Sequence, residues 1–529
     1  MITTTNTIKL SGADGIPVLV ECSVEPGIGI HLVGLADAAV KESLLRTVTA
    51  LQANGYRIPG KKIVINLAPT DLYKSGCGYD LPIALALIAA SDQDEGKLKE
   101  LGRWFVVGEL GLDGSVRDVP GCIQAVGAAI LTGCKGVVIP KGNGVEIVDL
   151  LDEKSIPVYG VASLNEAIDT VSGKATVPTV WEDPANEPTE NHKAEDPAWD
   201  GITGNEAAKR ALEIAAAGGH HILLAGASEG TRCKLAKALR DILPPMTKEE
   251  ALSVARIWSA SGKGAFRAAG TEGVRRRPFR APHYSSSMAA LLGGGGGENI
   301  RPGEVSLASG GVLFIDEYRE APKSVKEALR GPVEDKEITI SRLKTKVRFP
   351  ARFQLAAGTA LCPCGKYGEG ERCTCTAGQR AAYLQGLSGP VFDSIDIQAF
   401  IHQETTPPWM KVTPPEGNDA ASVSERVAKA REIQNQRFGD GRLNADMKTA
   451  DISRHCALGD DEAELIETLI TRLGLSARSY NRILKIARTI ADLDGREAIG
   501  ISDLAEAASY RFLDRRGFGQ ETSEAQKSA

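Results

Sequence analysis

The chain has 529 residues, 42% of them hydrophobic and 25% charged, with a formal net charge of −6 at pH 7. This composition predicts a folded globular protein with two or three domains, and the acidic balance excludes a nucleic-acid binder whose whole surface is basic. No apolar run reaches the length of a membrane span and the first residues lack a signal-peptide core, so the sequence predicts a cytoplasmic protein without membrane partners. Ten cysteines in such a chain indicate thiols or metal ligands rather than disulfides.

Residues 1–170 alternate between predicted strands and helices, which is typical of an α/β domain. A hairpin is predicted to turn at Asp113-Gly114. The other predicted elements are strands at 16–24, 61–69 and 135–141 and a helix at 80–91.

The remainder of the chain divides by composition. Residues 171–200 hold four prolines and seven carboxylates against two lysines, which predicts an acidic interdomain linker. A second α/β domain is predicted over 201–403. Apolar stripes at helical spacing predict a helical domain over 404–515, and 516–529 is predicted to be a disordered tail.

The stretch LLAGASEGTRCKLAKAL (residues 223–239) has the layout of a phosphate-binding loop, G-x-x-x-x-G-K-[ST], but not its chemistry. Gly226 stands at the first glycine and Gly230 lies inside the loop. The second glycine, the lysine and the hydroxyl residue are replaced by Thr231, Arg232 and Cys233. A planar guanidinium is a poor substitute for a lysine among phosphates, and a thiol lacks the hard oxygen that Mg²⁺ prefers. Weak nucleotide binding is therefore expected.

A predicted buried strand in GGVLFIDEYRE (310–320) ends at Asp316 and Glu317. Many NTPases use such a pair to hold Mg²⁺ and to polarise the attacking water. A core strand that stops at acidic residues is also common, and alone this pattern favours that interpretation. Its position about 90 residues after a strand, a glycine turn and a helix favours a nucleotide site.

The stretch CPCGKYGEGERCTC contains Cys362, Cys364, Cys373 and Cys375. Two C-x-C pairs joined by a glycine-rich loop are able to wrap a tetrahedral thiolate site, so one structural Zn²⁺ is predicted. Four free surface thiols and a redox pair are the alternatives.

Residues 338–349 (ITISRLKTKVRF) predict a β-hairpin in which cations recur at every second position. The structural alternative is an edge strand that uses its cations against aggregation. The functional alternative is a row of cations that grips a DNA backbone without reading sequence. From the residues alone the two are equally supported. The cations are Arg342, Lys344, Lys346 and Arg348.

Several long runs, among them NLAPTDLYKSGCGYDLPIALA, RPFRAPHYSSSMAALLGGG and RPGEVSLASGGVLFIDE, make the chain resemble the ComM/YifB family, the magnesium-chelatase-like AAA+ proteins of bacteria. The resemblance extends nearly end to end. It implies a first domain with a fold like the C-terminal domain of Lon protease (ribosomal S5 domain 2-like), an AAA+ core with a four-cysteine insert at 362–375, and a helical lid. It also implies a hexameric ring that uses ATP and Mg²⁺ to migrate DNA branches during natural transformation and recombination, and it favours DNA as the partner of the predicted hairpin.

The family pattern identifies two further departures. Where the family has an asparagine that positions the attacking water, this chain has Ala360, and where it reads Asp-Arg-Ile-Asp, with a probable arginine finger, this chain has Ser394. By the resemblance, Asp316 (as Mg²⁺ ligand) and Glu317 remain as catalytic groups and Arg478 is the second sensor arginine. ATP hydrolysis is therefore expected to be slow or absent, unless Arg232 reaches the β-phosphate and compensates locally.

The first domain lacks the Lon-type protease dyad. The nucleophile position falls on Gly78 and the lysine position on Ile123, while the adjacent Cys77 is interpreted as a structural thiol.

Two functions are compatible with the whole sequence. One is an ATP-driven branch-migration motor, and the other is a nucleotide-insensitive scaffold or DNA-binding subunit that works with an active paralogue. A sequence decaying without selected activity is a third possibility. Magnesium insertion into a porphyrin is the least supported, because the resemblance covers only the ATPase-like part.

Overall fold

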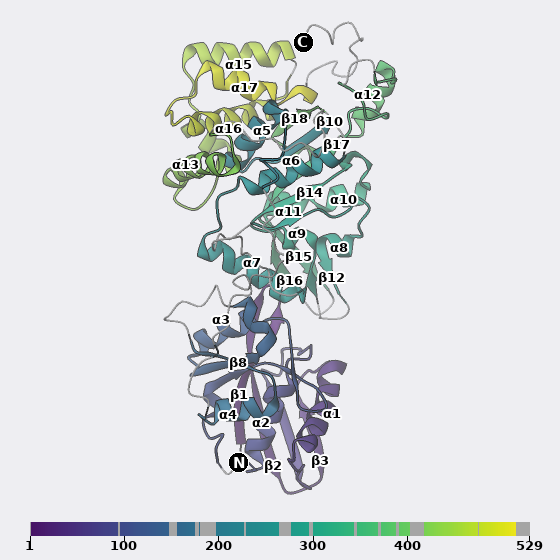
Figure 1. The fold of residues 1–529 in the computed structure, drawn as a ribbon, viewed down its shortest axis with the longest axis vertical. Helices are drawn as coiled ribbons and strands as arrows, with labels where there is room; N and C mark the ends of the chain where they lie inside the picture. The colour runs from purple at the N-terminus through teal and green to yellow at the C-terminus, as the bar shows by residue number, and fades with distance from the viewer. Residues whose placement is uncertain are drawn as a thin grey trace.

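Figure 1 shows an elongated molecule in which the N-terminal unit lies at one end and a helical C-terminal region lies at the other. It is a computed structural model. The described residues are 2–93, 96–147, 156–174, 179, 197–226, 229–263, 277–295, 300–342, 346–368, 372–387, 391–402, 417–473 and 475–514. Most of the predicted linker and all of the predicted tail lie outside them.

The N-terminal unit is built on a mixed seven-stranded sheet with the order β3-β4-β2-β1-β5-β8-β9. The helix α2 is apolar on all sides and is almost wholly buried against this sheet, while α3 packs on β1, β2, β5 and β8. The short hairpin β6–β7 confirms the predicted turn. The elements are β1 (Ile2–Ser11), β2 (Asp14–Glu25), β3 (Gly29–Val33), α1 (Ala38–Ala53), β4 (Lys62–Ala68), α2 (Asp80–Ala90), β5 (Trp104–Val106), β6 (Glu109–Leu110), β7 (Val116–Arg117), α3 (Cys122–Thr132), β8 (Gly136–Pro140), β9 (Val158–Val161) and α4 (Leu164–Val171).

The central unit contains a parallel five-stranded sheet with the order β11-β14-β17-β10-β18. Its inner strands β10, β14 and β17 are buried at every residue, as parallel strands covered on both faces are expected to be. The elements are α5 (Glu206–Gly218), β10 (Ile222–Gly226), α6 (Glu229–Asp241), α7 (Lys248–Ser261), β11 (Phe279–Arg280), α8 (Met288–Leu292), β12 (Gly293–Gly294), β13 (Arg301–Pro302), α9 (Glu304–Leu307), β14 (Val312–Ile315), α10 (Lys323–Ala328), α11 (Arg330–Asp335), β15 (Glu337–Ser341), β16 (Lys346–Pro350), β17 (Gln354–Thr359), α12 (Ala377–Gln385) and β18 (Ile397–Ile401).

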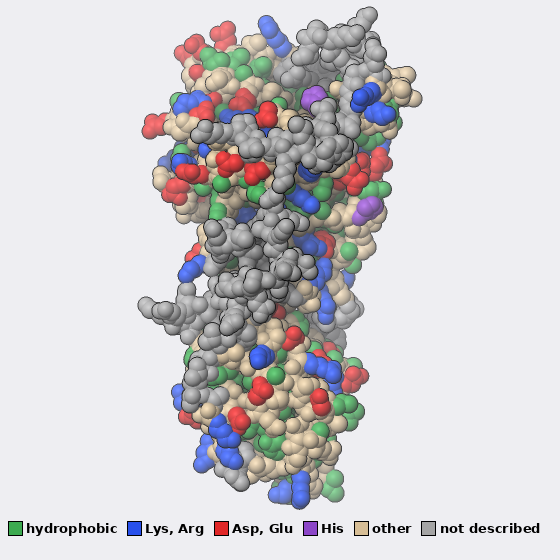
Figure 2. All heavy atoms as spheres, in the orientation of Figure 1, with side chains coloured by type: hydrophobic (Ala, Val, Ile, Leu, Met, Phe, Trp, Pro, Cys, Tyr) green, Lys and Arg blue, Asp and Glu red, His purple; other side chains and the backbone are tan. Residues whose placement is uncertain are grey.

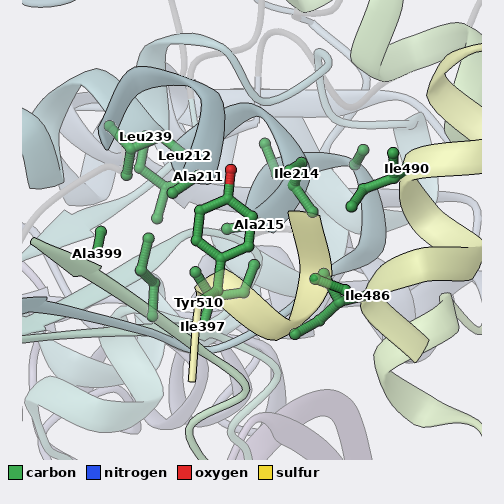
Figure 3. Close-up of a cluster of buried hydrophobic side chains, with 14 of the residues drawn as sticks. Ala211, Leu212, Ile214, Ala215, Leu239, Ile397, Ala399, Ile486, Ile490 and Tyr510 are labelled. Atoms are coloured by element: carbon green, nitrogen blue, oxygen red, sulfur yellow. The ribbon is translucent and has the colours of Figure 1, made fainter. Parts of the chain in front are cut away.

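The C-terminal region is helical, as predicted. The helices α13 and α16 pack on α5, whose many alanines allow them to approach closely. Figure 3 shows this shared core, in which Ile486 and Ile490 of α16 and Tyr510 meet side chains of α5 and β18. The helices are α13 (Ala420–Phe438), α14 (Thr449–His455), α15 (Asp460–Leu473), α16 (Ala477–Leu493) and α17 (Ile501–Ser509). No helix of the described residues is long and apolar enough to cross a membrane.

The N-terminal unit meets the central unit through α3 and α7. The side chain of Gln124 donates to the carbonyl of Arg256 at 2.7 Å, and the Ser259 hydroxyl donates to Glu146 at 2.7 Å. The turn between β1 and β2 also touches the hairpin formed by β15 and β16, because a Cβ on Gly12 would lie 2.5 Å from the carbonyl oxygen of Arg348 in β16. The β15–β16 hairpin is thus anchored between the two units.

Candidate functional site

The centre of the candidate nucleotide site is a buried ion-pair cluster around Arg232 of α6. Its Nε donates to Asp316 Oδ1 at 2.7 Å, and its Nη2 donates to Asp316 Oδ2 at 3.1 Å and to Glu317 Oε1 at 2.5 Å. Its Nη1 donates to the carbonyl of Gly226 at 3.1 Å. The side chain is only 2% exposed. The residue at the lysine position therefore binds the two acids rather than facing an open loop.

The strand β14 sets the position of the two acids. Its four apolar residues are buried and the chain leaves the sheet at Asp316. Glu317 follows with φ 47° and ψ 42°, a left-handed conformation that is uncommon for a residue other than glycine and persists where surrounding contacts impose it. The neighbouring strand β17 needs a glycine at position 358, because a Cβ on Gly358 would lie 2.1 Å from Asp316 Oδ1.

Electrostatic attraction between Arg232 and the two carboxylates stabilises this cluster. Burial lowers the pKa of Arg232, but its hydrogen bonds to Asp316 and its attraction to Glu317 outweigh burial and raise the pKa above the ordinary value. Bidentate guanidinium–carboxylate pairs of this kind are among the stronger charged hydrogen bonds in proteins. Both oxygens of Asp316 and Oε1 of Glu317 already accept hydrogen bonds from Arg232, so a Mg²⁺ ion here would compete with the guanidinium for them. The donor set at this site does not fit a Mg²⁺–nucleotide complex unless Arg232 moves.

Part of the predicted phosphate-binding loop belongs to the helix α6. The strand ends at Gly226 and the helix begins at Glu229, so Glu229, Gly230 and Thr231 are helical. A phosphate-binding loop needs backbone N–H groups turned towards the anion, and a carboxylate in the first helical turn faces the positive end of the helix dipole, where the phosphate would bind. Burial raises the pKa of Cys233, which keeps its thiol protonated.

The other positions expected at the site do not join this cluster. Ala360 has no polar side-chain atom, and Ser394 ends the 3-10 helix η8 (Phe392–Ser394). Arg478 lies on α16 and its Nη1 pairs with Asp393 Oδ2 at 3.0 Å, with both side chains largely exposed. Of the residues predicted to act on a nucleotide, the structure brings together Gly226, Arg232, Asp316 and Glu317.

The four cysteines of the predicted metal site do come together. All four sulfur atoms lie within 4.8 Å of one another, directly beyond the end of β17. Cys362 Sγ lies 3.4 Å from Cys364 Sγ and 3.7 Å from Cys373 Sγ. A tetrahedral Zn²⁺ with Zn–S bonds of about 2.3 Å needs sulfur atoms about 3.8 Å apart, so this donor set fits zinc.

The predicted hairpin is present as β15 and β16, and its residues alternate as expected. Lys346 and Arg348 are exposed, whereas Val347, which lies between them, and Phe349, which follows them, are buried. Arg348 Nε lies 3.5 Å from Glu337 Oε1. Figure 2 shows Lys and Arg side chains along one flank of the middle of the molecule, at the level where Figure 1 places this hairpin. Arg342 is also exposed, and Lys344 lies outside the described residues.

The N-terminal unit has neither the nucleophile nor the lysine of a Lon-type protease. The nucleophile position is Gly78, just before α2, and the lysine position is Ile123, which is buried in α3. Burial, together with the nearby Glu109, raises the pKa of Cys77 to about 12, so this thiol is not activated.

Sequence reasoning missed the polar network that joins the central sheet to the helical region. The two ring nitrogens of His220 lie 2.9 Å from Asp396 Oδ2 and 2.9 Å from Thr489 Oγ1 of α16. Burial acts to raise the pKa of Asp396, but the hydrogen bond with His220 and nearby cations lower it to about 2. The pair His220-His221 beside a buried strand was the only available signal.

This network predicts an acid-sensitive contact. Because the pKa of Asp396 is about 2 in the folded protein and its ordinary value is 3.8, its stabilising contribution is complete above pH 4 and is lost as the pH falls towards 2. We expect Asp396→Asn to lower the free energy of unfolding by about 2 kcal/mol at pH 6 and by less than about half of that at pH 2.5. Urea unfolding at both pH values measures this, and a difference that does not change with pH contradicts it.

Comparison with known proteins gives a consistent result. The model of the family "Magnesium chelatase, subunit ChlI" matches residues 198–407, and models of two further ChlI parts match 20–143 and 417–511. The chain is 39% identical to YifB of Escherichia coli and 38% identical to YifB of Salmonella typhimurium, in each case over 95% of this chain and 96% of the relative. It is 40% identical to the competence protein ComM of Haemophilus influenzae over 92% of both chains.

Proposed function

Because the chain belongs to the ComM/YifB family of magnesium-chelatase-like AAA+ proteins, we propose that it is a DNA-binding subunit of this type whose own nucleotide site is held shut by Arg232. The observation that carries this proposal is the bidentate pair between Arg232 and Asp316, extended to Glu317. The groups that would bind Mg²⁺ and polarise water neutralise an internal cation instead. ATP binding is weak and hydrolysis is slow or absent.

The remaining parts of the proposal follow the family. The chain forms a ring of like subunits, with the hexamer as the expected size, in which 404–515 is the lid and 1–170 serves assembly or DNA contact. An active paralogue in the same ring supplies turnover where movement along DNA requires it. The second candidate is an ATP-driven branch-migration motor, which the retained acids at the end of β14 favour. That function requires Arg232 to leave Asp316 for a phosphate.

DNA binding rests on the exposed cations of the β15–β16 hairpin. We expect Lys346→Ala with Arg348→Ala to weaken binding of branched or single-stranded DNA and to reduce the slope of log K against log salt by about 1.5. The control pair Lys429→Ala and Arg330→Ala removes exposed cations from α13 and α11 and leaves the slope unchanged. Fluorescence anisotropy at several salt concentrations measures both pairs. Equal losses in the two pairs would show that the hairpin is not the DNA contact.

Nucleotide independence is tested in the same assay. We expect ATP with Mg²⁺ to change the DNA affinity of the wild-type protein by less than about threefold, a coupling below ~0.7 kcal/mol. A change of tenfold or more favours the motor.

Zinc at the cysteine cluster is part of the proposal. We expect one zinc per chain in untagged protein purified without chelator, because the four sulfur atoms already have nearly tetrahedral spacing. Cys373→Ser with Cys375→Ser loses the metal, whereas Cys134→Ser, which changes a cysteine outside the cluster, retains it. Elemental analysis decides the question, and wild-type protein without zinc contradicts the prediction.

A further inference from the structure

The segment 362–387, called here the cysteine module, begins shortly after β17 and ends shortly after α12. Its described residues are 362–368 and 372–387. Figure 1 shows α12 beside the sheet, on the side opposite to the helical C-terminal region. The module thus follows directly after the strand whose Gly358 abuts Asp316.

The cysteine cluster fixes the beginning of α12. Thr376, the residue after Cys375, caps the helix and forms a reciprocal capping box with Gln379. One turn later, Arg380 Nη1 donates to the carbonyl of Cys375 at 2.8 Å, and its guanidinium lies 5.1 Å from the centre of the Tyr367 ring. The first turn of α12 is therefore tied to the backbone that carries the sulfur ligands.

The end of α12 holds Arg319. Its Nε donates to the carbonyl of Tyr383 at 2.9 Å, and its guanidinium stacks on the Tyr383 ring at 4.1 Å. The fit is close, because a Cβ on Gly386 would lie 2.9 Å from Arg319 Nε. Burial, with a contribution from the charges of Glu317 and Glu320, raises the pKa of Tyr383 to about 12.

Arg319 is two residues beyond Glu317, in the 3-10 helix η6 (Tyr318–Glu320). The carbonyl of Arg319 also accepts a hydrogen bond from Lys326 Nζ at 2.7 Å. Glu317 itself is in a left-handed conformation, which requires support from surrounding contacts. The contacts of Arg319 with α12 and Lys326 restrain the chain two residues beyond Glu317, whose carboxylate binds Arg232.

We infer that the cysteine module is a metal-dependent clamp: a thiophilic divalent cation such as Zn²⁺ fixes α12, and α12, through Arg319, holds Glu317 against Arg232. This inference rests on the proposed function for its account of the shut site, and it adds what keeps that site shut. Loss of the metal releases α12, Arg319 and then Glu317. Arg319 and Tyr383 are positioning residues, since they are proposed to act on the cluster through the chain around Glu317.

The test is hydrogen exchange on the full chain with zinc bound and after zinc removal by a chelator under reducing conditions. We expect metal removal to speed amide exchange in 361–376 and, at least about tenfold, in 313–320. In Arg319→Ala the exchange of 313–320 is already fast with zinc bound, and metal removal adds nothing there. Tyr383→Phe keeps the ring and the carbonyl and behaves as the wild type. Arg330→Ala, which removes an exposed arginine paired with Glu334, is the matched control.

Each outcome decides a separate point. Faster exchange confined to 361–376 overturns the clamp, as does wild-type protein without bound metal. Fast exchange of 313–320 that still responds to metal in Arg319→Ala overturns the route through Arg319. Nucleotide binding, measured on the same samples, tests the shut site separately, because a wild-type site open to ATP contradicts the proposed function whatever the exchange pattern.

Discussion

Replacing Arg232 with alanine is expected to lower the free energy of unfolding by about 3 kcal/mol, the lower end of the range for breaking a buried ion pair. The variant leaves two carboxylates, Asp316 at 15% and Glu317 at 32% side-chain exposure, without their shared cation. It also removes the donor to the Gly226 carbonyl. Partial access to water at the two acids limits the loss. Urea unfolding at neutral pH measures it.

Two controls define this prediction. Arg330→Ala breaks an exposed pair with Glu334 and is expected to change the free energy of unfolding by less than about 0.5 kcal/mol. Adding Asp316→Asn and Glu317→Gln to Arg232→Ala removes the unpaired charges, so the triple variant is expected to regain about half of the loss. A loss below about 0.5 kcal/mol in Arg232→Ala alone shows that the cluster is not a stable feature of the fold.

The wild-type protein is expected to turn over ATP at least about a thousandfold more slowly than ordinary AAA+ enzymes, which work near 1 s⁻¹ or above. We propose that four changes act on one reaction path: Arg232 binds the acids, and, by the resemblance to the family, Cys233 replaces a hydroxyl residue that binds Mg²⁺, Ala360 replaces the asparagine that positions water, and Ser394 replaces the arginine finger. Loss of the finger alone costs on the order of a thousandfold. Steady-state phosphate release measures this rate.

Stepwise repair separates binding from chemistry. Thr231→Gly, Arg232→Lys and Cys233→Thr together are expected to raise nucleotide affinity at least about tenfold and to leave turnover low. Adding Ala360→Asn and Ser394→Arg is then expected to raise turnover at least about a hundredfold, and Glu317→Gln in that background abolishes it. Wild-type turnover near 1 s⁻¹ that Glu317→Gln abolishes would refute the account of a shut site.

The strands and helices with a regular apolar pattern were predictable because their burial follows local periodicity. The buried strand before Asp316 and the amphipathic helix α16 are examples, and the alternation around Lys346 and Arg348 in β16 is another. The strand β1 was not predicted, because its buried face carries Thr5 and Thr7 rather than apolar residues. The short strand β3 pairs only at the edge of the sheet and gave no local signal.

The sequence predicted which residues belong to the candidate site, but it did not predict which of them contact one another. Sequence alone identified Arg232, Asp316 and Glu317, yet Arg232 and Asp316 are 84 residues apart, and their pairing depends on how α6 packs beside β14. The motif indicated a weak phosphate contact, whereas the fold gives the guanidinium a different partner. The contact between Arg319 and Tyr383 was not predictable either, because Arg319 donates to the backbone carbonyl of Tyr383, and every residue type has such a carbonyl.

Titration of the wild-type protein with fluorescent ATP and Mg²⁺ shows whether Arg232 closes the nucleotide site. We expect weak binding, with a dissociation constant of about 1 mM or higher with or without branched DNA, and binding at least about tenfold tighter in the variant with Thr231→Gly, Arg232→Lys and Cys233→Thr. Micromolar affinity in the wild type, lost in Arg232→Ala, would mean that Arg232 leaves Asp316 and Glu317 to hold phosphate and that the site is not shut.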